Sequence, residues 1–160
     1  MSEYTARIHW AKSAGENYID NRFSRGHTWS FDGGVTVPAS PSPHVVPAPL
    51  SVAEAVDPEE AFVASLSSCH MLYFLAFAAK KQYVVEEYTD DAVGVMEKND
   101  EGRSWMAKVT LRPRARFSGD AQPSHDELAA LHQKSHELCI IANSVKSDVT
   151  VAFQKTDVTA

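Results

Sequence analysis

The stretch DPEEAFVASLSSCHMLYFLAFAAKK, residues 57–81, decides the fold of this chain. Asp57 is a good helix N-cap, Pro58 suits the first helical position, and Glu60 stands three residues after the cap, as in a capping box. Two lysines close the stretch, where positive charge is favourable to the helix dipole. The pattern therefore predicts one long helix.

This helix is apolar on every side over residues 61–79, which is about the length of a membrane span. Its centre carries Ser65, Ser67, Ser68, Cys69 and His70, where a membrane-spanning helix should be most apolar. We therefore expect a buried helix of a soluble protein and no membrane. Because such a helix must be covered all round, it should lie at the centre of the fold or between two subunits.

Around this helix the apolar period changes to two, most clearly over residues 105–117, which predicts a half-buried strand. Residues 83–98 are also typical of a strand, and the turn sequence at 99–102 joins the two into a long hairpin. Five of the eight prolines lie between Pro38 and Pro49 and predict a surface loop. Further strands are expected near residues 4–10, 29–37 and 145–153, and a second helix at 124–138. Nothing divides the chain, so we predict a single α+β domain over residues 1–160.

Composition excludes several classes of function. The net charge of −6 leaves no basic stripe for nucleic acid. The first 30 residues hold no apolar block, so no secretory signal peptide is expected and the protein should be cytoplasmic. The two cysteines lie 70 positions apart, and a reducing compartment argues against a permanent disulfide between them. If they pair, they do so transiently.

Taken alone, Cys69 has the features of an inert buried cysteine. It lies about twelve residues into the helix, beyond the reach of the helix dipole, and its apolar neighbours disfavour a thiolate. A reactive Cys69 therefore needs a positive charge from elsewhere in the protein.

Two motifs carry a resemblance to a known family. The first is Asp57-Pro-Glu-Glu followed by small residues and then Cys69; the second is His136-Glu-Leu-Cys139-Ile-Ile-Ala-Asn143-Ser. In this order, with a hairpin and a helix between them, they resemble the two cysteine segments of the OsmC/Ohr family, and the similarity extends from Tyr4 to Phe153. The resemblance implies antiparallel sheets around a long central helix, an interwoven homodimer, and a peroxidase that reduces organic hydroperoxides.

The resemblance also implies roles for individual residues. Cys69 would be the thiolate that attacks the peroxide, and Cys139 the resolving thiol. Glu59 matches an active-site glutamate, but a straight helix puts it about 15 Å from Cys69, so either the helix breaks or Glu59 serves the Cys69 of the other subunit. The family's N-terminal arginine is assigned to Arg25, with Arg22 second. No bound cofactor is expected; the external reductant would be a thiol, such as dihydrolipoamide or a lipoylated protein.

The sequence leaves two alternative functions open. The unusual segment around Arg25 and the proline-rich loop motivate a redox-sensing or small-ligand-binding module on the same fold that does not turn over. His125, His132, His136 and Cys139 share one helical face, a spacing that can bind zinc. The HExxH pattern is missing, so no metal site is expected there. His70 is predicted to be a packed or hydrogen-bonded core histidine.

Overall fold

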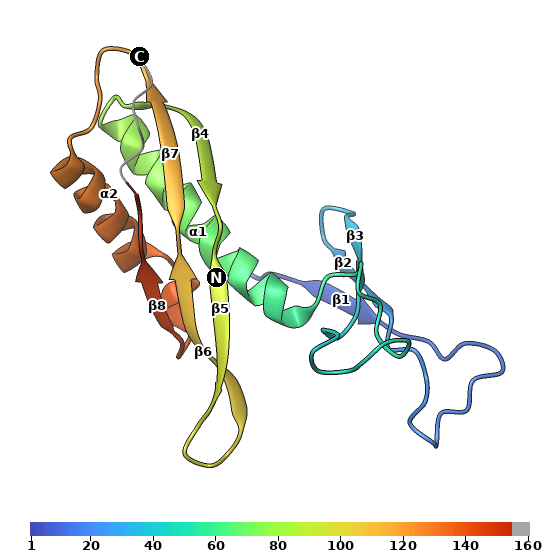
Figure 1. Ribbon diagram of the computed structural model, residues 1–160. Helices are drawn as coiled ribbons and strands as arrows, with labels where there is room; N and C mark the ends of the chain where they lie inside the picture. Colours follow the sequence, from blue (N-terminus) through green and yellow to red (C-terminus); the bar gives the residue numbers. More distant parts are fainter. Residues whose placement is uncertain (155–160) are drawn as a thin grey trace. The chain divides into compact units, whose positions relative to one another are not determined.

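The structure is a computed structural model that describes residues 1–154. The described chain forms two compact units, Met1–Ala61 and the part from Phe62 on, and the long helix begins in one and continues in the other. The elements are the strands β1 (Ala6–His9), β2 (His27–Phe31), β3 (Thr36–Ala39), β4 (Val84–Asp90), β5 (Val93–Lys98), β6 (Ser104–Leu111), β7 (Pro113–Ser118) and β8 (Asp148–Val151), the helices α1 (Pro58–Lys80) and α2 (His125–Leu138), and the 3-10 turn η1 (Ala142–Ser144) (Figure 1).

The first unit is built on the antiparallel sheet β1-β2-β3. The turn between β2 and β3 uses Gly34 at a φ of +85°, a backbone conformation that favours glycine. The proline-rich segment after β3 folds back on the sheet, because the Ser40 amide donates to the Val56 carbonyl and the Val56 amide donates to the Pro38 carbonyl. These hydrogen bonds connect the beginning of the predicted surface loop to Val56, which follows the loop in sequence.

The second unit contains the predicted hairpin, bent into two pieces (Figure 1). β4 pairs with β7 and β5 pairs with β6, both antiparallel. At the bend, between β6 and β7, the backbone amide of Arg112 donates to Asp90 Oδ1 at 2.6 Å. The carboxylate thus satisfies an amide at the point where the strand pairing is interrupted. The last strand, β8, pairs parallel with β6, which departs from the otherwise antiparallel arrangement. A parallel neighbour requires a crossover connection, and α2 lies in it.

Helix α1 begins as its sequence predicts. The Glu60 amide donates to Asp57 Oδ1 at 2.7 Å, and the Asp57 amide donates to the Glu60 carboxylate at 3.3 Å. Both bonds together make a capping box. The long helix with its cap is therefore confirmed.

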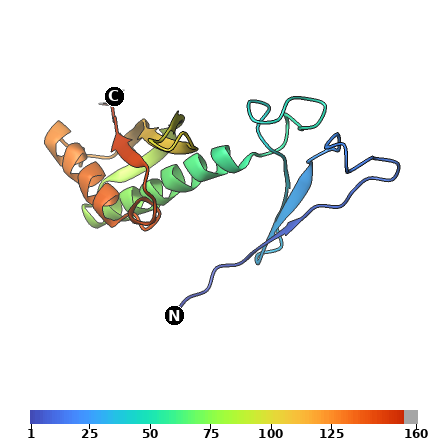
Figure 2. The ribbon, with the colours of Figure 1, turned by 90° about the horizontal axis from the view of Figure 1, so that it is seen from below.

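One stripe of α1 is buried within the chain, with Leu66, His70, Phe74 and Ala78 spaced four residues apart. Leu66 packs in a cluster with apolar residues of β6, while Phe74 and Ala78 pack in a second cluster shared by β7 and α2. The close approach of helix and sheet explains a glycine in β5: a Cβ on Gly94 would lie 2.6 Å from a methyl of Val63. Seen from below, α1 and α2 lie side by side against the strands of this unit (Figure 2).

The rest of the α1 surface is only partly covered by the described residues. Leu72 is 60% exposed, and only 22% of the most apolar part of the helix is buried. The helix is long and apolar enough to cross a membrane by those two criteria alone. However, its middle makes polar contacts of a kind found in soluble cores: Ser67 donates to Asp90 and His70 bonds to His132. The α+β fold predicted from the sequence is confirmed, with α1 as its longest helix.

Candidate functional site

Cys139 is held at the C-terminal end of α2 by the residues that follow it. The side-chain amide of Asn143 donates to the carbonyls of Glu137 and Cys139, both at 2.9 Å, and the Ser144 hydroxyl donates to the Ile140 carbonyl at 2.8 Å. These carbonyls belong to the end of a helix, where no further turn supplies donors. The Asn-Ser pair of the second motif therefore ends the helix and fixes the backbone of Cys139.

The two cysteines, 70 positions apart in sequence, come together in the second unit. The Cys139 thiol is buried, with 1% of the residue exposed, and the Cys69 thiol lies close enough to it to help raise its pKa. It also accepts the backbone N–H of Ala142 at 3.4 Å. Cys69 is half-buried, and both cysteines are reduced. The structure thus brings together the two sulfur atoms that the sequence motifs single out.

The two thiols differ in their surroundings. Burial raises the pKa of Cys139 to about 11, and the nearby Cys69 thiol adds to the effect, while the amide of Ala142 opposes it. Cys139 is therefore protonated at neutral pH. Because the thiolate is the nucleophilic form of cysteine, the more exposed Cys69 is the better placed of the two to react with a molecule from solution.

Glu59 and Arg25 both lie in the first unit, and they form no ion pair with each other there. Glu59 is in the first turn of α1, and its Oε2 atom is buried without a hydrogen-bond partner among the described residues. Arg25 is half-buried and bonds to its own loop, through Nη1 to the Phe23 carbonyl at 2.8 Å and through Nη2 to Asn21. Arg22 is exposed, and its backbone amide donates to Asp20.

A buried pair of histidines accompanies the thiols in the second unit. His70 Nε2 and His132 Nδ1 are 3.0 Å apart, and the His132 ring also stacks on Phe74 and Phe153, with centroids 4.5 and 4.8 Å away. His70 Nδ1 is buried without a partner. A neutral ring carries one N–H, so placing it on His70 Nε2, where it can donate to His132, avoids a buried unpaired donor.

The sequence prediction for His70 is thereby confirmed, whereas its partner was missed. A signal for it existed: His132 follows Leu131 and stands four residues after Leu128, on the stripe of α2 that faces the core. The face of α2 does not gather metal ligands. Among residues 1–154, no three His, Cys, Asp or Glu side chains form a group that could hold a metal ion.

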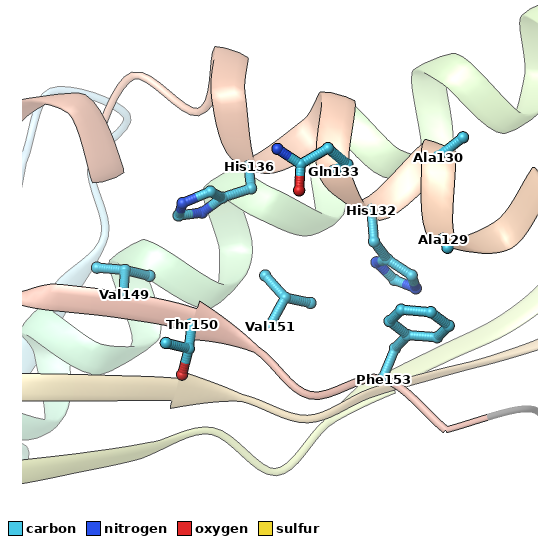
Figure 3. A pocket seen from close by; sticks show the side chains of 9 residues that line it. All are labelled: Ala129, Ala130, His132, Gln133, His136, Val149, Thr150, Val151 and Phe153. Carbon is cyan, nitrogen blue, oxygen red and sulfur yellow. The ribbon is translucent and has the colours of Figure 1, made fainter. Parts of the chain in front are cut away.

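A pocket of about 530 Å³ lies between α2 and β8 (Figure 3). Figure 3 shows the His132 imidazole facing the Phe153 ring, with His136 further along the helix. The lining residues are Ala129, Ala130, His132, Gln133, His136, Val149, Thr150, Val151 and Phe153. They are mostly apolar, and they include no lysine, no arginine and no cysteine. Such a lining suits a neutral, partly apolar molecule.

The fold and the thiol pair define an α+β protein with two adjacent cysteines, one at the centre of a long helix and one at the end of a shorter helix. Residues 51–154 match the family model described as OsmC-like protein. The chain belongs to this family.

Solved structures agree with the assignment. An OsmC-like protein of unknown function from Vibrio cholerae is 53% identical, with a TM-score of 0.95 over 96% of this chain and 100% of that chain. An organic hydroperoxide resistance protein from Legionella pneumophila is 17% identical, with a TM-score of 0.64 over 96% of each chain. The organic hydroperoxide resistance protein OhrB of Bacillus subtilis is 16% identical, with a TM-score of 0.61 over 94% of this chain and 98% of that chain. No curated protein sequence gives a significant match.

The histidine pair makes the stability of the fold sensitive to acid. Burial lowers the pKa of His70 to about 4 and that of His132 to about 3, from 6.5 in an exposed histidine. Below pH 6.5 the unfolded chain binds protons that the folded chain does not. We therefore expect the free energy of unfolding to fall as the pH drops from about 6.5 toward 4, by up to about 1.4 kcal/mol per histidine and pH unit.

Urea unfolding across this pH range measures the effect. A variant with both His70→Gln and His132→Gln should lose most of this pH dependence, whereas His44→Gln, at an exposed position, should keep it. If the free energy of unfolding of the double variant depended on pH as strongly as that of the wild type, the buried histidines would not be its cause.

Proposed function

We propose that this protein is a thiol-dependent peroxidase that reduces organic hydroperoxides with Cys69 and Cys139 as its redox pair. The observation that carries the proposal is the contact between a half-exposed cysteine and a buried, protonated one. Structural neighbours in the same fold are named organic hydroperoxide resistance proteins, which supports the choice of substrate class. The more similar Vibrio cholerae protein is of unknown function, so the main support for the proposal comes from the thiols of this chain.

The proposed chemistry needs only these two sulfur atoms and an external reductant. The Cys69 thiolate attacks the outer oxygen of the hydroperoxide, the O–O bond breaks, and the alkoxide leaves as an alcohol after taking a proton. Cys69 is then a sulfenic acid. The Cys139 sulfur attacks the Cys69 sulfur, its proton and the departing hydroxide form water, and a disulfide results. A dithiol such as dihydrolipoamide, or a lipoylated protein, reduces that disulfide by thiol exchange.

Arg25 is proposed to supply the positive charge that favours the Cys69 thiolate and stabilises the departing alkoxide. Glu59 is proposed to pair with Arg25. Two observations support this pairing. Glu59 has a buried carboxylate oxygen without a partner, and three hydrogen bonds within the described residues leave two of the five arginine N–H groups unused.

A non-enzymatic alternative keeps one observation in its favour. The pocket between α2 and β8 is large enough for a small neutral molecule, and burial keeps the His132 at its side uncharged near neutral pH. Under this alternative the cysteines oxidise once, and the pocket binds the regulating ligand. Steady-state consumption of an organic hydroperoxide with dihydrolipoamide separates the two, because a sensor does not turn over.

Cysteine substitutions test the roles of the two thiols. Cys69→Ser should reduce hydroperoxide consumption to the uncatalysed rate, because the attacking sulfur is gone. Cys139→Ser should consume one equivalent of hydroperoxide and then stop with dihydrolipoamide as reductant, because no intramolecular disulfide can form. Normal turnover of Cys139→Ser with the same dithiol would show that Cys139 is not the resolving thiol.

The role of Arg25 is tested by titrating the Cys69 thiolate through its ultraviolet absorbance in a Cys139→Ser background. Arg25→Ala should move the midpoint to higher pH by about one to three units, the range expected for loss of a nearby opposite charge. Arg22→Ala is the matched control and should leave the midpoint unchanged. A shift in Arg22→Ala alone would move the role to Arg22, and no shift in either would remove arginine from the mechanism.

We also propose that the protein is cytoplasmic and forms a homodimer. The reason for the dimer is that only one stripe of α1 is buried within the chain, while apolar side chains such as Leu72 are exposed. A second copy of the same helix is a suitable cover. Light scattering at micromolar concentration should give twice the chain mass of 17.6 kDa, and Leu72→Glu should shift the protein toward the monomer. A monomeric wild-type protein would contradict this proposal.

A further inference from the structure

The loop that leads to Arg25, residues 11–24, is mostly exposed but has internal packing of its own. Trp10, Tyr18 and Phe23 form an aromatic cluster, with ring centroids 4.6 to 5.8 Å apart. The Trp10 indole N–H also donates to the Ser24 carbonyl at 2.9 Å. Such internal packing is typical of a compact surface loop whose two ends lie close together. This cluster fixes the two ends of the loop to each other, close to the position of Arg25 in sequence.

A carboxylate organises the interior of the same loop. Glu16 accepts the Ser24 amide at 3.0 Å and the Ser13 amide at 3.1 Å. The Ser24 amide is the main reason that the pKa of Glu16 lies below its usual value, so the carboxylate is charged near neutral pH. These bonds connect Ser24, the neighbour of Arg25, to the beginning of the loop.

The guanidinium of Arg25 is the side chain that this loop holds. Nη2 donates to the Asn21 carbonyl at 3.0 Å and to Asn21 Oδ1 at 2.8 Å, and Nη1 donates to the Phe23 carbonyl at 2.8 Å. The guanidinium carbon lies 4.5 Å from the centroid of the Phe23 ring. A free arginine side chain loses conformational entropy when it is held in one conformation. Here the loop has ordered it in advance.

Asn21 is suited to this task by its backbone. Its φ is +61°, in the left-handed region that asparagine tolerates better than most residues. In this conformation its main-chain and side-chain oxygens accept hydrogen bonds from the same nitrogen of Arg25. Only asparagine and aspartate combine a side-chain acceptor at this distance from the backbone with that tolerance.

We propose that Asn21 is a positioning residue for Arg25, which it holds through two hydrogen bonds so that the remaining guanidinium N–H groups face their reaction partners in a fixed direction. The inference rests on the proposed function, since it gives Arg25 its role toward Cys69. Asn21 does not touch the substrate; it acts through Arg25 alone. Its loss should therefore matter only while Arg25 is present.

The test compares Asn21→Gly, Arg25→Ala and the variant carrying both changes. Glycine keeps the positive φ and the main-chain acceptor and removes only Oδ1. Asn17→Ala is the matched control, because Asn17 Oδ1 accepts only the Ile19 amide of the same loop. The readouts are kcat/KM for an alkyl hydroperoxide with dihydrolipoamide, the thiolate titration of Cys69 in a Cys139→Ser background, and thermal unfolding.

Asn21→Gly should lower kcat/KM roughly tenfold, the effect of one lost hydrogen bond to a charged group. It should also move the thiolate titration to higher pH by less than Arg25→Ala does, and the double variant should match Arg25→Ala. Asn17→Ala should resemble the wild type. If Arg25→Ala shifts the titration while Asn21→Gly does not, or if Asn21→Gly lowers the rate further in the Arg25→Ala background, the positioning role is overturned. If Arg25→Ala itself has no effect, the proposed role of Arg25 fails, and the positioning role of Asn21 is overturned with it.

Discussion

The burial of one stripe of α1 against the strands and α2 is the constraint on which the second unit depends. Leu66 and Phe74 are fully buried in two different clusters, so the rotation of the helix about its axis is determined at both places. His70 lies between them on the same stripe. Cys69, its neighbour in sequence, points about 100° away from it and is only half-buried. The packing of the helix therefore fixes the position of Cys69 and leaves this residue partly accessible to solvent.

The second helix completes the arrangement from the other side. The leucines of α2 pack on the same stripe, and its C-terminal end carries Cys139 to the Cys69 thiol. Asn143 stops the helix at the position that this contact requires. Burial raises the pKa of Cys139 and keeps this thiol protonated at neutral pH, while its neighbour Cys69 is only half-buried. The difference in burial between the two thiols, which a two-step thiol mechanism can use, follows from the packing of the two helices.

Local patterns account for what could be predicted from the sequence. The cap of α1 depends on residues within four positions, so Asp57 was recognisable, and the second helix was expected to begin near Ser124. The hairpin was predicted from the alternation of apolar and polar residues in β6 and β7 and from the turn sequence after β5. Three features depend on distant neighbours and could not be predicted: the parallel pairing of β8 with β6, the bond between His70 and His132, and the retention of Arg25 by Asn21. The last depends on a positive φ that nothing near Asn21 in sequence demands.

The most direct test of the central claim is the fate of the two sulfurs after one turnover. The reduced wild-type protein is treated with one equivalent of an alkyl hydroperoxide, quenched with a thiol-alkylating reagent and analysed by mass spectrometry with peptide mapping. The proposed mechanism predicts the loss of two hydrogen atoms from one chain and a disulfide that joins Cys69 to Cys139. Free alkylated thiols at both positions, or Cys69 overoxidised while Cys139 remains a thiol, would contradict it.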